Sequence, residues 1–226
     1  MTNTGIKPGD KLQVQTYNWG PCVIRFKIKD QLKNLLIQEA KISTKDFREN
    51  LAGQLDKEVG YGEESRNKVV PFISQYLGVY DQMFQKYRNK KYEKKPEYFM
   101  SSMWVNFQRQ FEFNPPHDHD GCLSFVIYLS IPDELKKEHA AYKGKSAGPG
   151  GIQFLYGDGD MFIFPAWLKH WVCPYKSDVV RVSVSGNIHD SAPLNSIKEK
   201  SLQYTPESEK HIKEQEEYLE ELKKKI

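Results

Sequence analysis

The sequence predicts a mainly β fold with flanking helices, in which the strands form an antiparallel double-sheet barrel. Residues 98–190 contain short apolar segments that are separated by turn signals and not by regular helices. Helical periodicity occurs in the residues before them and in the tail. Aromatic residues make up 13% of the 226-residue chain, which indicates a packed core.

The N-terminal part is predicted to begin with strands and to continue with helices. Residues 11–17 and 22–28 alternate apolar with polar side chains, as two strands around a turn would. Closely spaced leucines predict a first helix over residues 30–58. A second helix is predicted over residues 70–87, because apolar side chains recur there every three or four residues. We expect these helices to build a platform for a substrate.

Strands and turns follow in the second half of the chain. Residues 132–151 are a polar insertion, and residues 205–226 have the charge pattern of a helix. We expect one domain overall, with N-terminal strands and supporting helices (1–97), a β-sheet core that carries the site (98–190) and a charged C-terminal helix (191–226). The predicted strands of the core are 104–113, 123–131, 152–156, 161–165 and 179–188.

Charge and cysteine content narrow the classes of function and the compartment. The net charge of +3 is too small to predict a nucleic-acid-binding surface. No segment has the roughly 20 consecutive apolar residues of a membrane span. Cys22, Cys122 and Cys173 are odd in number and have no C-x-x-C spacing, so we expect reduced thiols. These features predict a cytoplasmic protein without a membrane or nucleic-acid partner.

Three histidines and one arginine have the spacing of a metal site beside an anion site. His117 and His119 precede an apolar strand, and side chains at positions i and i+2 of a strand point the same way. His170 follows far along the chain, as a ligand from another strand would. Three ligands on one face of a metal leave other positions open. Arg181 lies in an apolar strand, where an arginine needs an anionic partner. A carboxylate matches the geometry of the guanidinium donors. The other histidines, which we expect on the surface, are His139, His189 and His211.

These residues stand in motifs that resemble those of 2-oxoglutarate/Fe(II)-dependent dioxygenases. The motifs are Asn-Pro-Pro-His-Asp-His-Asp-Gly at 114–121, Gly-Asp-Met-Phe-Ile-Phe-Pro at 159–165 and Arg-Val-Ser-Val-Ser-Gly-Asn at 181–187. The chain is most similar to the small prolyl-4-hydroxylase-like group, which includes hydroxylases of marine tailed phages. The resemblance covers roughly residues 104–188 and implies a double-stranded β-helix, or jelly-roll, core with helices on one side.

The resemblance also implies a role for each matching residue. His117 and His170 take the places of the first and the distal metal ligand. Arg181 and Ser183 take the places of the residues that hold the far carboxylate of 2-oxoglutarate. No catalytic residue is expected beyond the metal ligands. Further contacts to 2-oxoglutarate are expected from Tyr128, Asn106 and Asn187.

Position 119 departs from the family pattern, because the usual motif is His-any-Asp and this chain has His119. Three interpretations stay open. His119 is itself the second ligand, which strand alternation favours; Asp118 or Asp120 supplies the carboxylate; or water fills the position. A further interpretation takes His119 as the first ligand and Gly121 as the small residue that leaves room for a halide, which predicts halogenation.

The resemblance implies an enzyme that uses Fe(II), 2-oxoglutarate and O2 and that releases succinate and CO2. Hydroxylation of a prolyl or other amino-acid side chain in a peptide is the first expectation, and a small-molecule substrate is the second. For a viral protein the expected location is the host cytoplasm. The rival from another class is a cupin-like jelly-roll protein that binds metal without 2-oxoglutarate chemistry. Such a protein has no need for Arg181, which favours the oxygenase.

Overall fold

The computed structural model describes residues 20–88, 91–92, 94–143 and 157–191, which form two antiparallel sheets and three α-helices. The predicted strands at 11–17 and 152–156 and the predicted helix at 205–226 lie outside the described residues. The helices are α1 (Asp30–Ile42), α2 (Glu63–Arg88) and α3 (Asp133–Ala141), with a short 3-10 helix η1 (Arg48–Asn50). The strands are β1 (Ile24–Lys27), β2 (Lys45–Asp46), β3 (Glu58–Gly60), β4 (Tyr98–Gln108), β5 (Asn114–His117), β6 (Leu123–Ser130), β7 (Asp160–Pro165), β8 (His170–Val172) and β9 (Arg181–Asp190).

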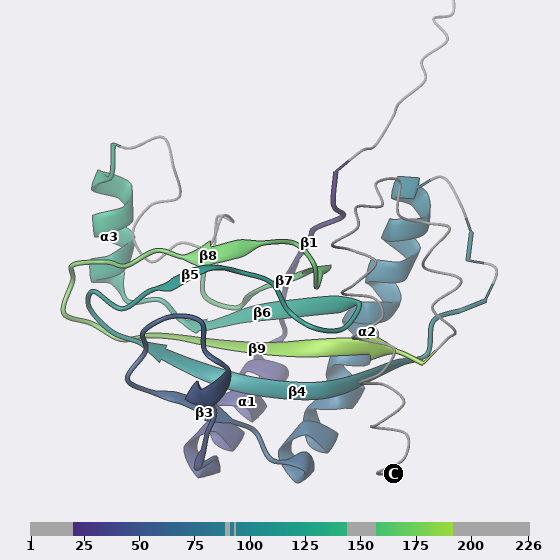
Figure 1. Ribbon diagram of the computed structural model, residues 1–226, viewed down its shortest axis with the longest axis horizontal. Helices are drawn as coiled ribbons and strands as arrows, with labels where there is room; N and C mark the ends of the chain where they lie inside the picture. The colour runs from purple at the N-terminus through teal and green to yellow at the C-terminus, as the bar shows by residue number, and fades with distance from the viewer. Residues whose placement is uncertain (1–19, 89–90, 93, 144–156, 192–226) are drawn as a thin grey trace, which may run out of the picture.

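The two sheets lie one above the other (Figure 1). The larger sheet has seven strands in the order β1-β7-β6-β9-β4-β3-β2, and every neighbouring pair is antiparallel. The smaller sheet consists of β5 and β8 and lies over one face of the larger one, whereas α1 and α2 cover the opposite face (Figure 1). This arrangement confirms the predicted mainly β fold with a jelly-roll core and flanking helices.

Side chains along the central strands alternate between the two faces of the larger sheet. Val184 on β9 and Val105 on β4 belong to the apolar cluster under the helices. Their neighbours Ser183 and Asn106 line a cavity on the other face. Because successive side chains of a strand point to opposite sides, the helices close one face of the sheet and leave the other face to polar groups.

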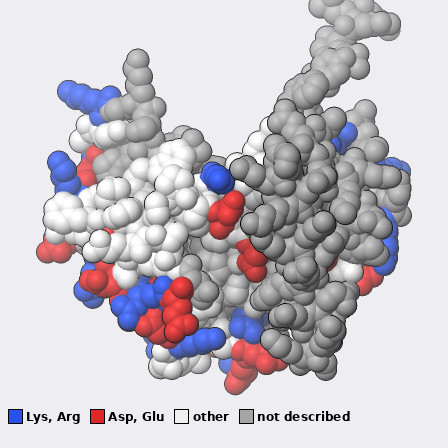
Figure 2. Space-filling model, in the orientation of Figure 1, with Lys and Arg blue, Asp and Glu red and all other residues white. Residues whose placement is uncertain are grey.

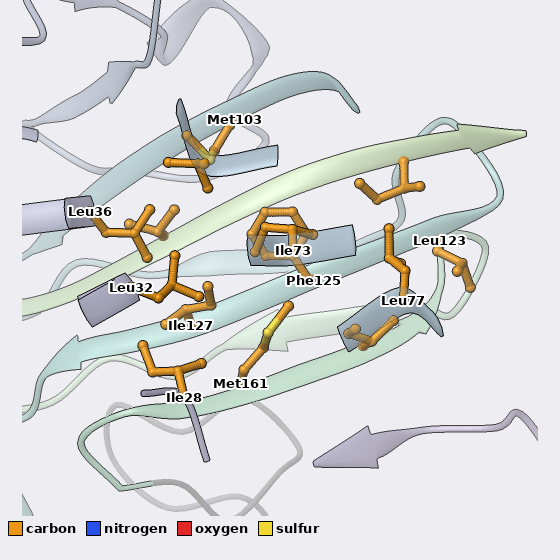
Figure 3. Close-up of a cluster of buried hydrophobic side chains, with 14 of the residues drawn as sticks. Ile28, Leu32, Leu36, Ile73, Leu77, Met103, Leu123, Phe125, Ile127 and Met161 are labelled. Atoms are coloured by element: carbon orange, nitrogen blue, oxygen red, sulfur yellow. The ribbon is translucent and has the colours of Figure 1, made fainter. Parts of the chain in front are cut away.

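Helices α1 and α2 pack on the sheet through apolar side chains one helical turn apart (Figure 3). Leu32 and Leu36 of α1 are fully buried, and Ile73 and Leu77 of α2 repeat the same spacing. Each fully buried Leu or Ile stabilises the fold by about 1.5–3 kcal/mol relative to exposure. The labelled sheet residues that they join in Figure 3 are Met103, Leu123, Phe125, Ile127 and Met161.

The first helix is shorter than predicted and ends at Ile42 instead of near residue 58. Ser43 caps its end, because the backbone N–H and the hydroxyl of Ser43 both donate to the carbonyl oxygen of Glu39. The chain then forms β2, η1 and β3, and Glu58 pairs with β4. The prediction was wrong because its apolar spacing covered only α1. The pairing that follows is long-range, and no local pattern reveals it.

The other described elements lie near their predicted positions. Helix α2 confirms the second predicted helix and begins earlier, at Glu63. Strand β4 ends at Gln108 and not at 113, since the chain turns at Phe111, whose φ is 64°. The described part of the predicted polar insertion contains α3, whose Leu135 packs into a second apolar cluster.

The described surface carries charges of both signs. On the face shown in Figure 2, Lys and Arg side chains lie next to Asp and Glu side chains along the lower edge. Within the described residues no helix has the length and apolar character needed to cross a membrane.

Candidate metal centre

The three predicted metal ligands meet on the smaller sheet. His117 on β5 and His170 on β8 are directly opposite each other in the antiparallel pair. His119 follows β5 and is held there by its backbone N–H, which donates to the carbonyl oxygen of Ala166 at 3.0 Å. The ring centroids of the three histidines lie 4.3–5.0 Å apart. Residues that are far apart in the sequence are thus brought together by one strand pair.

The distances between the imidazoles fit one metal ion. One ring nitrogen of each histidine lies within 4.8 Å of the corresponding nitrogen of the other two. The Nε2 atoms of His119 and His170 are 3.2 Å apart. Two nitrogen ligands at about 2.1 Å from one ion, at right angles to each other, are about 3 Å apart. His117, His119 and His170 therefore offer three donors on one side of a single position.

Backbone carbonyls determine which ring nitrogen faces this position. Nδ1 of His117 lies 2.7 Å from the carbonyl oxygen of Pro115, and Nδ1 of His170 lies 3.0 Å from that of Leu168. A ring nitrogen that binds a carbonyl carries the proton, so Nε2 of a neutral imidazole keeps its lone pair. Nε2 of His170 faces Nε2 of His119, whereas Nε2 of His117 accepts a hydrogen bond from the side-chain amide of Asn114 at 3.3 Å, a contact that metal binding would replace. Such hydrogen bonds orient histidine ligands in metal sites. The donor set suits a divalent transition metal such as Fe(II).

Burial keeps the three imidazoles neutral. Loss of solvation lowers the pKa of His119 to about 3 and the pKa of His170 to about 4. The pKa of His117 is also lowered, mainly by burial. Repulsion between the imidazoles adds to the lowering for His119 and His170. Neutral imidazoles bind a cation without first releasing a proton.

The carboxylates beside His119 do not join the histidine cluster. Within the described chain, the group of candidate ligands that lie within 4.8 Å of one another contains three histidines and neither Asp118 nor Asp120. Asp120 instead accepts a hydrogen bond from the side-chain amide of Asn187, and its other oxygen lies 3.6 Å from Nε2 of His189. This geometry favours His119 over either aspartate as the second ligand.

His189 is buried, with 1% of its surface exposed, and the prediction that it lies on the surface was wrong. Its ring stacks on Phe99 at 5.2 Å. Burial of Asp120 acts to raise its pKa, but the hydrogen bond and the charge of His189 outweigh burial, and the net shift is downward. Strand alternation could have predicted this burial, because every second residue of β9 from Arg181 onward lies on one face and His189 is one of them. His139 is half-buried, and His211 lies outside the described residues.

The backbone conformation and surroundings of Gly121 require a glycine. Its φ is 90°, a conformation that other residues rarely adopt. A Cβ atom at this position would lie 2.5 Å from the carbonyl oxygen of Ile188. Gly121 is also not among the residues that line the cavity next to the histidines. The glycine is therefore explained by the close approach of β9 and not by room for a halide.

A cavity of about 450 Å³ opens beside the histidine cluster, on the sheet face away from α1 and α2. Arg181 and Ser183 of β9 line it, and each has 2% of its surface exposed. Asn106 of β4 lines it as well. The residues that were expected to bind a metal and those expected to bind a carboxylate thus share one cavity.

Tyr128 and Asn187, which are expected to contact 2-oxoglutarate, differ in their position relative to the cavity. Tyr128 is fully buried and does not line the cavity, and its ring centre lies 5.6 Å from the guanidinium carbon of Arg181. Asn187 lines the cavity, but its amide oxygen accepts a hydrogen bond from Ser124 at 3.2 Å and its nitrogen donates to Asp120. Their contacts therefore support Arg181 and Asp120.

The far wall of the cavity comes from the chain between α1 and α2. Phe47, Leu51 and Leu55 line it, and Phe47 stacks on Trp104 with ring centroids 5.3 Å apart. The helices themselves cover the opposite face, so the expectation that they form the substrate platform was wrong. The predicted helix over residues 30–58 did not reveal this wall, because long-range strand pairing brings its residues to the cavity.

Glu58 lines the same wall and is 4% exposed. Among the described residues none donates a hydrogen bond to its carboxyl group or pairs with it. Burial raises the pKa of Glu58 from its ordinary value of 4.5 to about 8, and the nearby charge of Asp46 adds to the effect. From the sequence alone Glu58 is one acidic residue among many. Its burial follows from the pairing of β3 with β4.

The raised pKa of Glu58 predicts a dependence of stability on pH. Between pH 4.5 and about 8 the folded protein binds more protons at Glu58 than the unfolded chain does, so stability falls as pH rises through this window. Glu58→Gln removes this dependence. We expect the variant to gain stability over the wild type by on the order of a few kcal/mol as pH increases from about 5 to about 8. Urea unfolding at both pH values measures the difference, and a difference that is independent of pH would contradict the burial of a titrating carboxyl group.

A family model matches the central part of the chain. Residues 102–187 match the family described as "Putative 2OG-Fe(II) oxygenase". This segment runs from within β4 to within β9 and contains the three histidines, Arg181 and Ser183. It does not contain Glu58 or the wall formed by Phe47, Leu51 and Leu55. A search of curated proteins found no match.

Several solved structures are similar in shape at low sequence identity. A viral collagen prolyl hydroxylase from Paramecium Bursaria Chlorella virus-1 has 13% identity and a TM-score of 0.46, over 74% of this chain and 94% of that one. A prolyl-4-hydroxylase from Pseudomonas putida has 12% identity and a TM-score of 0.47, over 74% and 91%. A 2OG-Fe(II) oxygenase family oxidoreductase from Burkholderia pseudomallei has 11% identity and a TM-score of 0.49, over 74% and 84%.

Proposed function

We propose that this protein hydroxylates an amino-acid side chain, with prolyl as the first candidate, and releases succinate and CO2. The proposal builds on the match of residues 102–187 to an Fe(II)/2-oxoglutarate-dependent oxygenase family. The family match confirms the predicted enzyme class and the predicted use of Fe(II), 2-oxoglutarate and O2. The substrate, the products and the residue roles that follow are our proposal.

One observation carries the assignment of residues. His117, His119 and His170 converge on one position, and Arg181 with Ser183 lines the same cavity. His117, His119 and His170 would hold Fe(II), and Arg181 with Ser183 would hold the far carboxylate of 2-oxoglutarate. Bound Fe(II) supplies the O2-dependent oxidation that couples decarboxylation of 2-oxoglutarate to hydroxylation.

The chain's own residues bind, orient and shield. The carbonyl oxygens of Pro115 and Leu168 hold two imidazoles with Nε2 toward the metal position. Arg181 is almost completely buried, so its attraction for a carboxylate is weakened little by solvent. Tyr128 lies against the guanidinium group and fixes its place. Such fixed positions are what a preorganised site requires.

The apolar wall supports an apolar substrate group near the metal. Phe47 and Trp104 stack, and Trp104 lies 5.5 Å from the ring of His119. Leu51 and Leu55 continue this wall. A pyrrolidine ring or another aliphatic side chain would bury its surface against these residues.

The substrate class is tested by mass spectrometry of peptides. Purified enzyme is incubated with Fe(II), 2-oxoglutarate, O2 and a set of peptides that present proline, lysine or another aliphatic residue in a fixed context. We expect the gain of one oxygen atom in an amino-acid side chain, with an equal amount of succinate. Succinate formed together with oxygenation of a free small molecule, and of no peptide, would leave the oxygenase in place and overturn the proposed substrate class.

The ligand role of His119 is tested by restoring the usual family residue. His119→Asp places a carboxylate where a second ligand is expected, and we expect Fe(II)-dependent succinate formation to persist, whereas His119→Ala should lose at least about tenfold. Anaerobic titration measures the Fe(II) affinity of both variants. We expect His119→Ala to lose affinity and His119→Asp to keep it. Equal, wild-type affinity in both variants would show that water or an aspartate fills this position.

A further inference from the structure

Glu58 lies in one cross-strand row with residues of the proposed 2-oxoglutarate site. The register pairs Glu58 of β3 with Asn106 of β4, and Asn106 with Ser183 of β9. All three line the cavity. Neighbouring strands are about 4.8 Å apart, so Glu58 is about 10 Å from Ser183 along the sheet. The carboxyl group is therefore in the same cavity as the proposed cosubstrate site, but two strands away from it.

The carboxyl group of Glu58 is buried in surroundings that offer it no partner among the described residues. Glu58 is 4% exposed, and within the described residues its carboxyl group has no hydrogen-bond or ion-pair partner. Its neighbours on the wall are mainly apolar, among them Phe47, Leu51 and Leu55. A buried carboxylate without a partner is costly. The upward shift in its pKa reports this cost.

We propose that Glu58 anchors a cationic group of the substrate, an ammonium or a guanidinium group, while the apolar wall holds the carbon chain next to it. This inference rests on the proposed function and deepens it, because it names the chemistry of the substrate end that faces away from Arg181. Within the proposed class of amino-acid side chains, the substrate would then be a basic one, which takes the place of prolyl as the first candidate. Glu58 would be a specificity-determining residue and take no part in the reaction itself.

The charges around Glu58 favour a cation over an anion. Asp46, on the neighbouring strand β2, adds negative potential, although Arg48 pairs with it at 2.6 Å in the solvent. Arg181, the buried cation of the cavity, lies on β9 and would be neutralised by the carboxylate of 2-oxoglutarate. A cation beside Glu58 would lower the pKa of its carboxyl group again and pair with the carboxylate, whereas an anion would meet the negative potential of Asp46.

The test compares a cation with a neutral molecule of similar size and shape. The full chain is loaded anaerobically with Fe(II) and 2-oxoglutarate, and binding of n-butylammonium and of n-butanol is measured by calorimetric or NMR titration. The variants are Glu58→Gln and, as a matched control, Glu49→Gln, which makes the same change at an exposed position of η1 outside the cavity. Blocked lysine serves as a third probe, for a cation that is carried by a peptide.

We expect the wild type to bind n-butylammonium at least about tenfold more tightly than n-butanol, because an ion pair with a buried carboxylate is lost in the alcohol. Glu58→Gln should remove this preference and Glu49→Gln should keep it. The inference is overturned when the wild type binds both probes equally, or when Glu58→Gln keeps the preference. Should Glu58→Gln not fold, the wild-type comparison decides. The visible band of the Fe(II)–2-oxoglutarate complex, recorded in the same samples, reports separately on the proposed function.

Discussion

His170→Ala is expected to lower Fe(II)-dependent succinate formation by at least about a hundredfold. Removal of one of three ligands weakens metal binding more than the 10–100-fold that follows from loss of a supporting group around a metal site. His170 is 4% exposed and its Nε2 lies 3.2 Å from that of His119, so the variant loses a donor that faces the metal position. Succinate release and anaerobic Fe(II) titration measure the effect.

The matched control for this variant is His139→Ala. His139 lies on α3, outside the histidine cluster, and the change removes the same side chain. We expect this control to keep the Fe(II) affinity and turnover of the wild type. Normal turnover in His170→Ala would refute the assignment of the metal ligands, whereas equal losses in both variants would point to a general loss of structure.

Arg181→Ala is expected to raise the KM for 2-oxoglutarate by roughly 30-fold or more. Truncation of one partner of a buried charge pair costs about 2–5 kcal/mol, which corresponds to this range and beyond. Arg181 is 2% exposed, and its donors form a planar fork that a lysine cannot reproduce. Arg181→Lys should therefore recover only part of the affinity. Steady-state kinetics of succinate release at varied 2-oxoglutarate measure both variants.

The control for Arg181→Ala is Arg109→Ala. Arg109 is an exposed arginine directly after β4, and it does not line the cavity. It should leave the KM unchanged. A KM in Arg181→Ala equal to that of the wild type would place the carboxylate of 2-oxoglutarate elsewhere.

The features that could be predicted from sequence were local ones. The spacing of His117 and His119 before an apolar strand follows from the two-residue period of strands, and the structure places both side chains beside His170. The place of Arg181 in an apolar strand predicted a half-buried arginine, and the structure buries it almost completely. A short pattern suffices in such cases, because the feature depends only on the residues of one strand.

The features that could not be predicted depend on which strands become neighbours. Glu58 is buried because β3 pairs with β4, and residues 43–58 contain no pattern that indicates this partner. His189 is buried beside Asp120 because β9 and the segment after β5 are packed together. The predicted helix over residues 30–58 failed for the same reason, since sheet pairing outweighs local propensity. The sequence therefore revealed the metal ligands but not the apolar wall of the cavity.

The most direct measurement is the anaerobic titration of the purified protein with Fe(II) and then 2-oxoglutarate, with the visible absorption spectrum recorded at each addition. We predict the weak charge-transfer band of the chelate, its loss in His170→Ala, and a shift of its 2-oxoglutarate dependence to higher concentration in Arg181→Ala. Metal binding without a band, and without change on addition of 2-oxoglutarate, would contradict the account and indicate a cupin-like metal-binding protein.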